Sequence, residues 1–565
     1  MMVNYTVDDF SITTLGSFYQ NDKTIFRVFA PEYEQLFLVI GENSYEMHRN
    51  GYNFEIALGG DLELVRYHYM NADGLTFKDP FAYVSIDGES AVMDRSKFNN
   101  HTVVMPEMKD VIIYEASVRD FSSDSSYNGI IKSKFLSFTE EGLRKDDYYM
   151  IGVDYIKNIG VTHIQLLPVF DFDNDKADYN WGYNPMAYNY VKKDYVMDNK
   201  DPYAYINELR TTVNRLHENG IRVVLDVVFN HVYDVNNFDL EKMLPGHVFR
   251  YMEDGTLAQG TLCGNEVKSE DVFVREYICE MVFRYLRLFD IDGIRMDLMG
   301  ISDKETVKKI FDLARVYKKD FLVYGEGWNM GDVLPEEERG SIRNHQDMPE
   351  IGMFNDFYRE TIINYICGNK DNKEDVKKAL MGSPDYLGYT QSINYVECHD
   401  GYTFFDHLQK YKAEKESWIN ERRCKLALAL IMVSRGIPFI HMGQEFLRSK
   451  NGIKNSYNSP DEINKIDWDL RVSNNDICDY FKDLVTIRKT FSEFTDKEVS
   501  ISFDDYYDCL IYKLGELVII INPTETEYTY NDGNNYEILF DLKGIRNNSL
   551  NIIKVLPYSI VICKL

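Results

Sequence analysis

Apolar and polar positions alternate along the middle of the chain in a pattern typical of strand–helix repeats. Short apolar runs that end in polar residues, such as 111–120 and 438–442, predict buried strands. Longer segments with apolar residues every three to four positions predict amphipathic helices at 203–219, 272–289, 304–317 and 418–433. This alternation predicts an α/β region built on a parallel sheet.

The two ends of the chain have a different pattern, with short strands separated by turn residues. Strand-like runs occur at 24–31 and 36–40 near the start, and at 509–513 and 517–522 near the end. We therefore expect a β-sandwich module at 1–105, an α/β domain at 106–493 and an antiparallel β domain at 494–565. The sequence has no internal repeat or low-complexity linker, so these parts should pack as one body.

Composition and charge restrict the partners of this protein. The 565 residues are 44% hydrophobic and 14% aromatic, enough for a large core. There are 91 acidic and 62 basic residues, for a net charge of −29. Such a surface disfavours nucleic acid and anionic membranes and suits an uncharged polymer.

The start of the chain and the cysteines indicate a compartment. The first residues carry no basic, apolar leader, and no apolar run is long enough to cross a membrane. Eight scattered cysteines without metal-ligand spacing indicate free buried thiols. We expect a cytoplasmic protein; a secreted form with its signal removed stays open as an alternative.

Four segments place charged residues at the ends of predicted strands, and one segment rich in aromatic residues precedes them. They are Tyr179-Asn-Trp-Gly-Tyr-Asn-Pro185, Leu225-Asp-Val-Val-Phe-Asn-His231, Gly293-Ile-Arg-Met-Asp297, Tyr324-Gly-Glu-Gly-Trp328 and Asn394-Tyr-Val-Glu-Cys-His-Asp400. The last four resemble, in order, the conserved regions of glycoside hydrolase family 13, the α-amylase family. The first resembles the signature of type I pullulanases, the debranching members of that family.

This resemblance implies a fold and a reaction. The fold would be a (β/α)8 TIM barrel, whose chemistry lies at the C-terminal ends of its strands. The N-terminal region resembles a family 48 carbohydrate-binding module, for which a purely structural role is at least as expected as glucan binding. The reaction would be hydrolysis of α-1,6-glucosidic linkages in pullulan and branched maltodextrins, starch or glycogen limit dextrins.

Three carboxylates match the catalytic residues of the family. Cleavage with retention needs two carboxyl groups about 5 to 5.5 Å apart, one as nucleophile and one as acid/base. The resemblance assigns Asp297 as nucleophile, Glu326 as acid/base and Asp400 as the group that stabilises the transition state. Arg295 should keep Asp297 ionised, while nearby carboxylates should raise the pKa of Glu326.

The resemblance also implies substrate-binding residues. His231 and His399 would hydrogen-bond the sugar at the cleavage point, and Tyr183 would form an aromatic platform beneath it. Trp328 would form a wall on the aglycone side, and Trp181 would lie in a loop that blocks the α-1,4 direction. The assigned substrate-binding set is Tyr183, His231, Arg295, Trp328 and His399.

Other polar residues in the motifs are expected to be structural. Asp226 should fix His231 and Arg295 through hydrogen bonds, and Glu115 and Glu397 should have structural or salt-bridging roles. The match of Asn230 to a calcium ligand of α-amylases leaves Ca2+ possible, although debranching enzymes often lack that site. No cofactor is required and no metal ligand is assigned.

Two departures from the family pattern leave alternatives open. Gly401 stands where debranching enzymes commonly have Asn, and Phe357 where pullulanases often have Arg. The alternatives are an isoamylase or glycogen-debranching type, and a neopullulanase or α-1,4-acting amylase. A non-catalytic glucan-binding relative is a distant alternative, because such proteins normally lose a catalytic carboxylate and all three are present here.

Overall fold

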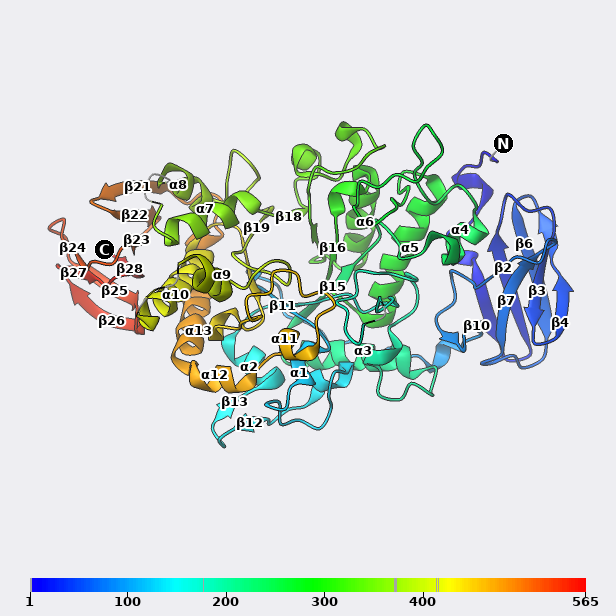
Figure 1. Cartoon of the computed structure of the whole chain (residues 1–565), viewed down its shortest axis with the longest axis horizontal. Helices are drawn as coiled ribbons and strands as arrows, with labels where there is room; N and C mark the ends of the chain where they lie inside the picture. Colours follow the sequence, from blue (N-terminus) through cyan, green and yellow to red (C-terminus); the bar gives the residue numbers. More distant parts are fainter. Residues whose placement is uncertain (1–2, 176, 370–372, 413, 415) are drawn as a thin grey trace.

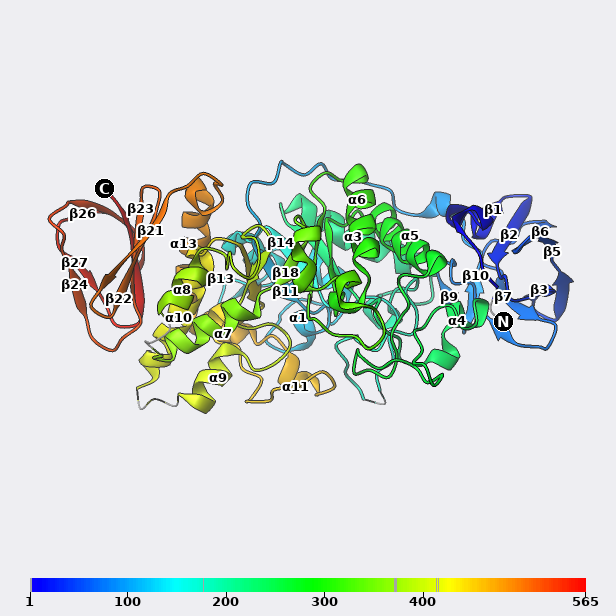
Figure 2. The same cartoon turned by 90° about the horizontal axis from the view of Figure 1, so that it is seen from above.

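The computed structural model describes residues 3–565 except 176, 370–372, 413 and 415. A closed barrel of eight strands forms its centre, and antiparallel sheets lie at the two ends of the long axis (Figure 1; Figure 2). The predicted (β/α)8 barrel with β structure on either side is confirmed. In the part of the chain so described, no helix is long and apolar enough to cross a membrane.

All neighbouring strands of the barrel are parallel. In order around the barrel they are β11 (Ile113–Ala116), β14 (His163–Leu166), β15 (Arg222–Val227), β16 (Gly293–Met296), β17 (Leu322–Gly325), β18 (Gly352–Phe354), β19 (Ser392–Asn394) and β20 (Ile437–His441). Side chains such as Ile113, Val224, Tyr324, Phe354 and Phe439 form one buried cluster. Parallel strands in one closed ring end at the same rim, which brings their C-terminal residues together.

Helices surround the barrel, and the predicted ones are confirmed to within a residue at each end. The longer helices are α2 (Gly152–Ile159), α3 (Ala204–Glu218), α5 (Val272–Phe289), α6 (Lys304–Tyr317), α7 (Asp356–Ile366), α10 (Ser417–Val433) and α13 (Asn475–Thr490). Shorter ones are α1 (Asp120–Ser123), α4 (Asp239–Met243), α8 (Lys373–Leu380), α9 (Phe404–Tyr411), α11 (Asp461–Asn464) and α12 (Trp468–Ser473). Asp271 and Asp303 cap α5 and α6 by accepting backbone N–H bonds, which explains where these helices begin.

Two antiparallel sheets precede the barrel. The first contains β1 (Gly16–Gln20), β2 (Lys23–Phe29), β6 (Asn53–Gly59) and β5 (His48–Asn50). The second contains β4 (Asn43–Glu46), β3 (Leu36–Ile40), β7 (Arg66–Asn71), β8 (Thr76–Phe77), β10 (Glu89–Ala91) and β9 (Ser85–Ile86). This region packs on the barrel: Phe29 stacks on Phe273 of α5 at 4.9 Å between ring centroids, and Arg284 donates to the Phe81 carbonyl at 2.7 Å.

A third antiparallel region follows the barrel. Its six-stranded sheet runs in the order β21 (Ile501–Tyr506), β22 (Cys509–Leu514), β23 (Leu517–Asn522), β28 (Ser559–Lys564), β25 (Tyr536–Asp541) and β26 (Gly544–Leu550). A two-stranded sheet of β24 (Tyr528–Tyr530) and β27 (Ile553–Val555) lies beside it. The ring of Phe540 lies 4.9 Å from that of Tyr480 on α13, which packs this region against the barrel.

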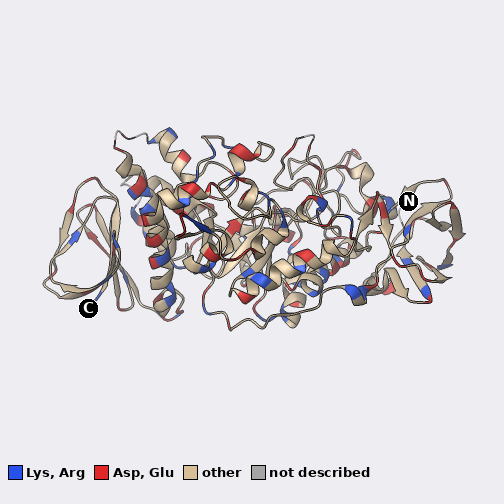
Figure 3. Cartoon of the chain, turned by 90° about the horizontal axis from the view of Figure 1, so that it is seen from below, with Lys and Arg blue, Asp and Glu red and all other residues tan. Residues whose placement is uncertain are grey.

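Charges and thiols are distributed over the whole chain. Acidic and basic residues are interspersed along the barrel helices (Figure 3). All eight cysteines are free, and five of them are buried. The expectation of buried thiols is wrong for Cys263, which is exposed, because it lies in a loop at the barrel mouth.

Candidate active site

A pocket of about 590 Å3 opens at the C-terminal ends of the barrel strands. It brings together six of the eight predicted site residues, from segments far apart in the sequence: Tyr183, His231, Asp297, Glu326, His399 and Asp400. Arg295 is buried beneath it, and Trp328 does not line it. Its rim also contains Leu262, Cys263, Asn455 and Tyr457.

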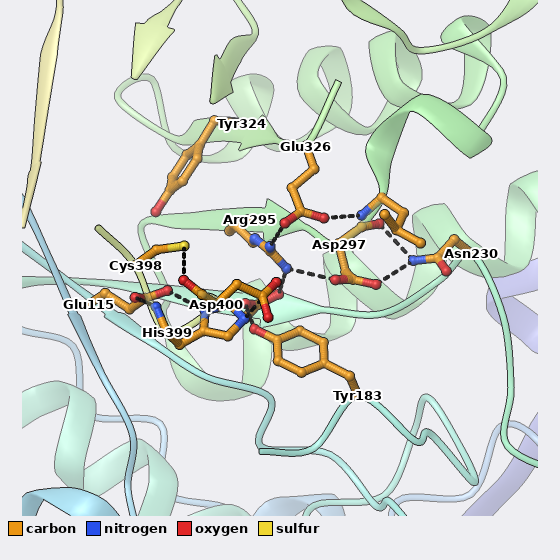
Figure 4. Close-up of polar contacts among 12 residues, drawn as sticks. Glu115, Tyr183, Asn230, Arg295, Asp297, Tyr324, Glu326, Cys398, His399 and Asp400 are labelled. Carbon is orange, nitrogen blue, oxygen red and sulfur yellow. Dashed lines mark hydrogen bonds and ion pairs between the residues drawn. The ribbon is translucent and has the colours of Figure 1, made fainter. Parts of the chain in front are cut away.

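Arg295 joins the acidic residues at the floor of the site (Figure 4). Its Nη1 donates to Asp297 Oδ1 at 3.0 Å and to Asp226 Oδ1 at 2.9 Å, and its Nη2 lies 2.6 Å from Glu326 Oε1. Asp297 follows β16 and Glu326 follows β17, the fourth and fifth strands of the barrel. One planar guanidinium therefore fixes the two predicted catalytic carboxyls next to each other.

Glu326 has the electrostatic surroundings of a proton donor. Burial is the largest cause that raises the pKa of Glu326 to about 7, and Asp297 and Asp400 raise it further against the opposing charge of Arg295. Its Oε2 accepts a hydrogen bond from the backbone N–H of Leu298 at 3.1 Å. The raised pKa predicted for Glu326 is confirmed, although burial contributes more than the neighbouring carboxylates.

Asn230 is a site residue whose position the sequence did not reveal. Its Nδ2 donates to Asp297 Oδ2 at 2.8 Å and to the Asp297 carbonyl at 2.7 Å. Its Oδ1 lies 2.5 Å from His231 Nδ1. The sequence signal for Asn230 was its place inside the motif that ends at His231. The resemblance, however, implied a calcium ligand and not a hydrogen bond to Asp297.

The prediction that Asp226 fixes both His231 and Arg295 is only half right. Asp226 accepts from Arg295 and, at 2.7 Å, from the Tyr183 hydroxyl. The ring of His231 is turned away, with Nε2 3.0 Å from the Tyr183 carbonyl and Nδ1 on Asn230. Burial lowers the pKa of His231, although Asp297 opposes this effect.

His399 lies among aromatic rings and a buried carboxylate. Tyr183 stacks on it at 5.0 Å between ring centroids, and Trp181 meets it edge-on at 4.9 Å. Glu115, at the end of β11, contacts His399 Nδ1 at 2.8 Å (Figure 4). The salt-bridging role predicted for Glu115 is confirmed. Glu397 lies 3.0 Å from His441 Nδ1, but burial raises the pKa of Glu397 to about 8 and lowers that of His441, so this contact is a hydrogen bond with a structural role.

Asp400 projects into open space at the mouth. Its side chain is 62% exposed, and its Oδ2 lies 3.8 Å from His399 Nε2. Gly401, which follows it, has a φ of +81°, and a side chain there would meet nothing within 4 Å. Gly and Asn both tolerate this left-handed conformation, which accounts physically for either residue at this position.

Two aromatic residues singled out in the sequence, Trp328 and Phe357, do not line the pocket. Trp328 is partly buried and packs with a cluster that includes Tyr395 and Phe354, so its contact with a glucan remains a prediction. Phe357 lies on α7 with its ring 6.0 Å from that of Tyr386.

Among the described residues, no group of three or more His, Cys, Asp or Glu side chains could hold a metal ion. Calcium dependence also remains a prediction.

Known proteins resemble this chain over nearly its whole length. Residues 151–243 match the family model "Alpha amylase, catalytic domain". The pullulanase of Bacillus subtilis strain 168 is 33% identical over 96% of this chain and 82% of its own.

Solved structures of pullulanases also match the fold of this chain. Pullulanase from Anoxybacillus sp. LM18-11, complexed with maltotetraose, matches with a TM-score of 0.93 at 32% identity, over 98% of this chain and 87% of its own. Pullulanase type I from B. subtilis str. 168, complexed with maltose, matches with a TM-score of 0.91 at 32% identity, over 98% and 85%. Because sequence, barrel topology and overall fold all agree, this chain belongs to the type I pullulanases, debranching members of glycoside hydrolase family 13.

Proposed function

We propose that this protein hydrolyses α-1,6-glucosidic branch linkages in pullulan and branched maltodextrins, with retention of configuration. The observation that carries the proposal is the contact of one guanidinium, Arg295, with both Asp297 and Glu326 at the barrel mouth. The relatives crystallised with maltotetraose and maltose support an α-glucan as the substrate.

In the first step one carboxyl acts as the nucleophile and the other as the acid. Asp297 attacks the anomeric carbon of the glucose on the glycone side and forms an ester with it. As the C1–O6 bond breaks, Glu326 gives its proton to the departing O6 of the branch-point glucose. The raised pKa of Glu326 leaves a large fraction of this group protonated near neutral pH, as the step requires.

The second step releases the product and restores both groups. Glu326, now ionised, takes a proton from water, and the resulting hydroxide attacks the anomeric carbon. The bond to Asp297 breaks, its carboxylate returns to the hydrogen bonds from Asn230 and Arg295, and the sugar leaves with its original α configuration. Asp400, projecting into the pocket, would hold ring hydroxyls of the distorted sugar.

Digestion of pullulan tests this proposal. Maltotriose as the product, released first as the α anomer in a proton NMR time course, is the expected result. Asp297→Asn serves as the control that excludes a contaminating enzyme. Panose as the product would indicate cleavage of α-1,4 bonds, and a β anomer would exclude the retaining mechanism.

A further inference from the structure

We infer that Glu115 is a positioning residue that holds His399 doubly protonated, with Nε2–H directed at a sugar hydroxyl in the pocket. The inference rests on the proposed function for its effect on turnover. It goes beyond the salt bridge itself, because it gives Glu115 a part in the reaction without contact with the substrate.

The geometry around Glu115 fixes one proton of His399. Glu115 is 1% exposed, and its Oε2 accepts from the His399 backbone N–H at 2.7 Å. Its Oε1 lies 2.8 Å from His399 Nδ1 and accepts from Gln165 Nε2 at 3.1 Å. Gln165 turns its amide NH2 toward Glu115, because the carboxylate only accepts, and its carbonyl then accepts from the Tyr324 hydroxyl at 2.6 Å. An ionised carboxylate only accepts hydrogen bonds, so Nδ1 of His399 carries a hydrogen.

The remaining contacts leave the second ring nitrogen to the pocket. Tyr183 covers one face of the His399 ring and Trp181 approaches it edge-on. Lys450 donates to the His399 carbonyl at 2.7 Å and so fixes the backbone rather than the ring. Nε2 lies 3.8 Å from Asp400 Oδ2, so that one sugar hydroxyl beside the pair can reach both, accepting from Nε2 and donating to Asp400.

The charged groups around the ring decide its protonation. Glu115 and Asp400 favour the imidazolium, as does Asp226 below it, while Arg295 and Lys450 disfavour it. Burial opposes the charged form most strongly, but Glu115 and Asp400 outweigh it and raise the pKa of His399 to about 9. His231 shows the contrast: its Nδ1 faces the neutral Asn230, and burial lowers its pKa.

The charged form changes what His399 can do for catalysis. A cationic donor makes a stronger hydrogen bond to a hydroxyl than a neutral one. It also supplies this bond over the whole neutral pH range, whereas an ordinary histidine is largely deprotonated there. Glu115 would thus extend the working range of the site toward alkaline pH.

Histidine NMR tests the pairing without any need for activity. In protein labelled with 15N-histidine, the signal lost in His399→Gln identifies this residue. We expect His399 to be doubly protonated at pH 8 in the wild type. In Glu115→Gln its pKa should fall by about 1 to 3 units, the usual effect of losing a close opposite charge. Glu397→Gln is the matched control, since this buried residue pairs with His441 instead and should leave the His399 signal unchanged.

Kinetics on pullulan test the consequence. At pH 8, Glu115→Gln should lower kcat/KM about tenfold, the difference between a charged and a neutral donor. The deficit relative to wild type should shrink at pH 5.5, where the imidazole is protonated again. In a His399→Gln background, the Glu115 change should cost less than about twofold, because the two residues act as one unit.

These measurements separate failure of the inference from failure of the proposed function. A wild-type His399 that titrates near its ordinary pKa, or one unaffected by Glu115→Gln, overturns the inference. So does a kinetic loss that is the same at both pH values and additive with His399→Gln, which would indicate a packing role. A wild type that shows the predicted NMR behaviour but does not cut pullulan would support the pairing and contradict the function.

Discussion

Arg295 Nη2 lies 2.6 Å from Glu326 Oε1, so the predicted acid/base is held by a buried cation. A guanidinium this close favours the ionised carboxylate, yet burial and two neighbouring carboxylates keep the pKa of Glu326 raised, at about 7. The same arginine contacts Asp297 through its other terminal nitrogen. One side chain therefore holds both carboxyls.

Asp297→Asn should abolish turnover while leaving the fold intact. The amide keeps the hydrogen-bonding size of the carboxylate but cannot form the glycosyl ester, so kcat on pullulan should fall by several powers of ten. Circular dichroism and thermal unfolding check that the variant is folded. More than about a tenth of the wild-type rate would contradict the role of Asp297 as nucleophile.

Glu326→Gln should lose less activity on a substrate that needs no acid. Gln cannot protonate O6, but an activated aryl α-glycoside has a leaving group that departs without a proton. Its first step, measured as a burst of phenolate, should therefore suffer much less than pullulan cleavage. Similar losses on both substrates would exclude Glu326 as the acid.

Asn230→Ala should weaken catalysis by misplacing Asp297. The variant loses the bond from Nδ2 to Asp297 Oδ2, and a hydrogen bond to a charged group contributes about 1.5 to 3 kcal/mol. If this contribution is realised in the transition state, kcat/KM should fall by roughly 10- to 100-fold. The loss of activity should be the same when the kinetics are measured with added Ca2+ and with a chelator. A defect that added Ca2+ corrects would instead support the calcium-ligand match.

Trp328→Ala tests the aglycone wall that the sequence predicts. A stacked aromatic contact is worth about 0.5 to 1.5 kcal/mol beyond its buried area, so the expected loss on pullulan is about 1 to 3 kcal/mol of transition-state binding. Rates on pullulan and linear amylose should be compared for both enzymes. Unchanged pullulan kinetics would assign Trp328 to the apolar cluster with Tyr395 alone, and rapid amylose cleavage by the wild type would contradict α-1,6 preference.

Asp292 should stabilise the fold at neutral pH and not in acid. It is 2% exposed, accepts from the Val223 N–H at 2.8 Å, and lies 2.7 Å from His217 Nε2 and 2.9 Å from Lys318 Nζ. Burial alone would raise its pKa, but these partners lower the pKa of Asp292 below that of an unfolded aspartate. Its contribution is therefore present above about pH 4, the pKa of the unfolded group, and is lost as pH falls through the folded value.

The measurement is the onset of thermal unfolding of the wild type and Asp292→Asn across pH. Breaking a buried pair costs about 3 to 5 kcal/mol. At pH 7 the temperature at which unfolding begins should therefore be clearly lower for Asp292→Asn than for the wild type. The two proteins should converge as the solution becomes strongly acidic. A gap that is constant with pH would assign the loss to packing instead of charge.

The sequence by itself determined the α/β centre and the main helices, and its resemblance to a known family identified the barrel and the three candidate carboxylates. Helices α5 and α6 begin and end where predicted, because Asp271 and Asp303 are strong local caps and the apolar spacing is regular. Asp297 and Glu326 were identified because their segments resemble conserved regions of glycoside hydrolase family 13, in which each carboxylate directly follows an apolar strand. These are local signals, carried by residues near one another in the chain.

Only the tertiary structure decided which polar side chains face each other. Glu115 and His399 are 284 residues apart, and the closure of the barrel brings the ends of their strands to one rim. Asp226 likewise accepts from Tyr183, which lies in the loop that follows β14, and not from His231 in its own segment. The protonation of Glu326 depends on burial and on charges contributed by other strands. Such properties arise from three-dimensional proximity and desolvation, which a linear pattern of residues does not specify.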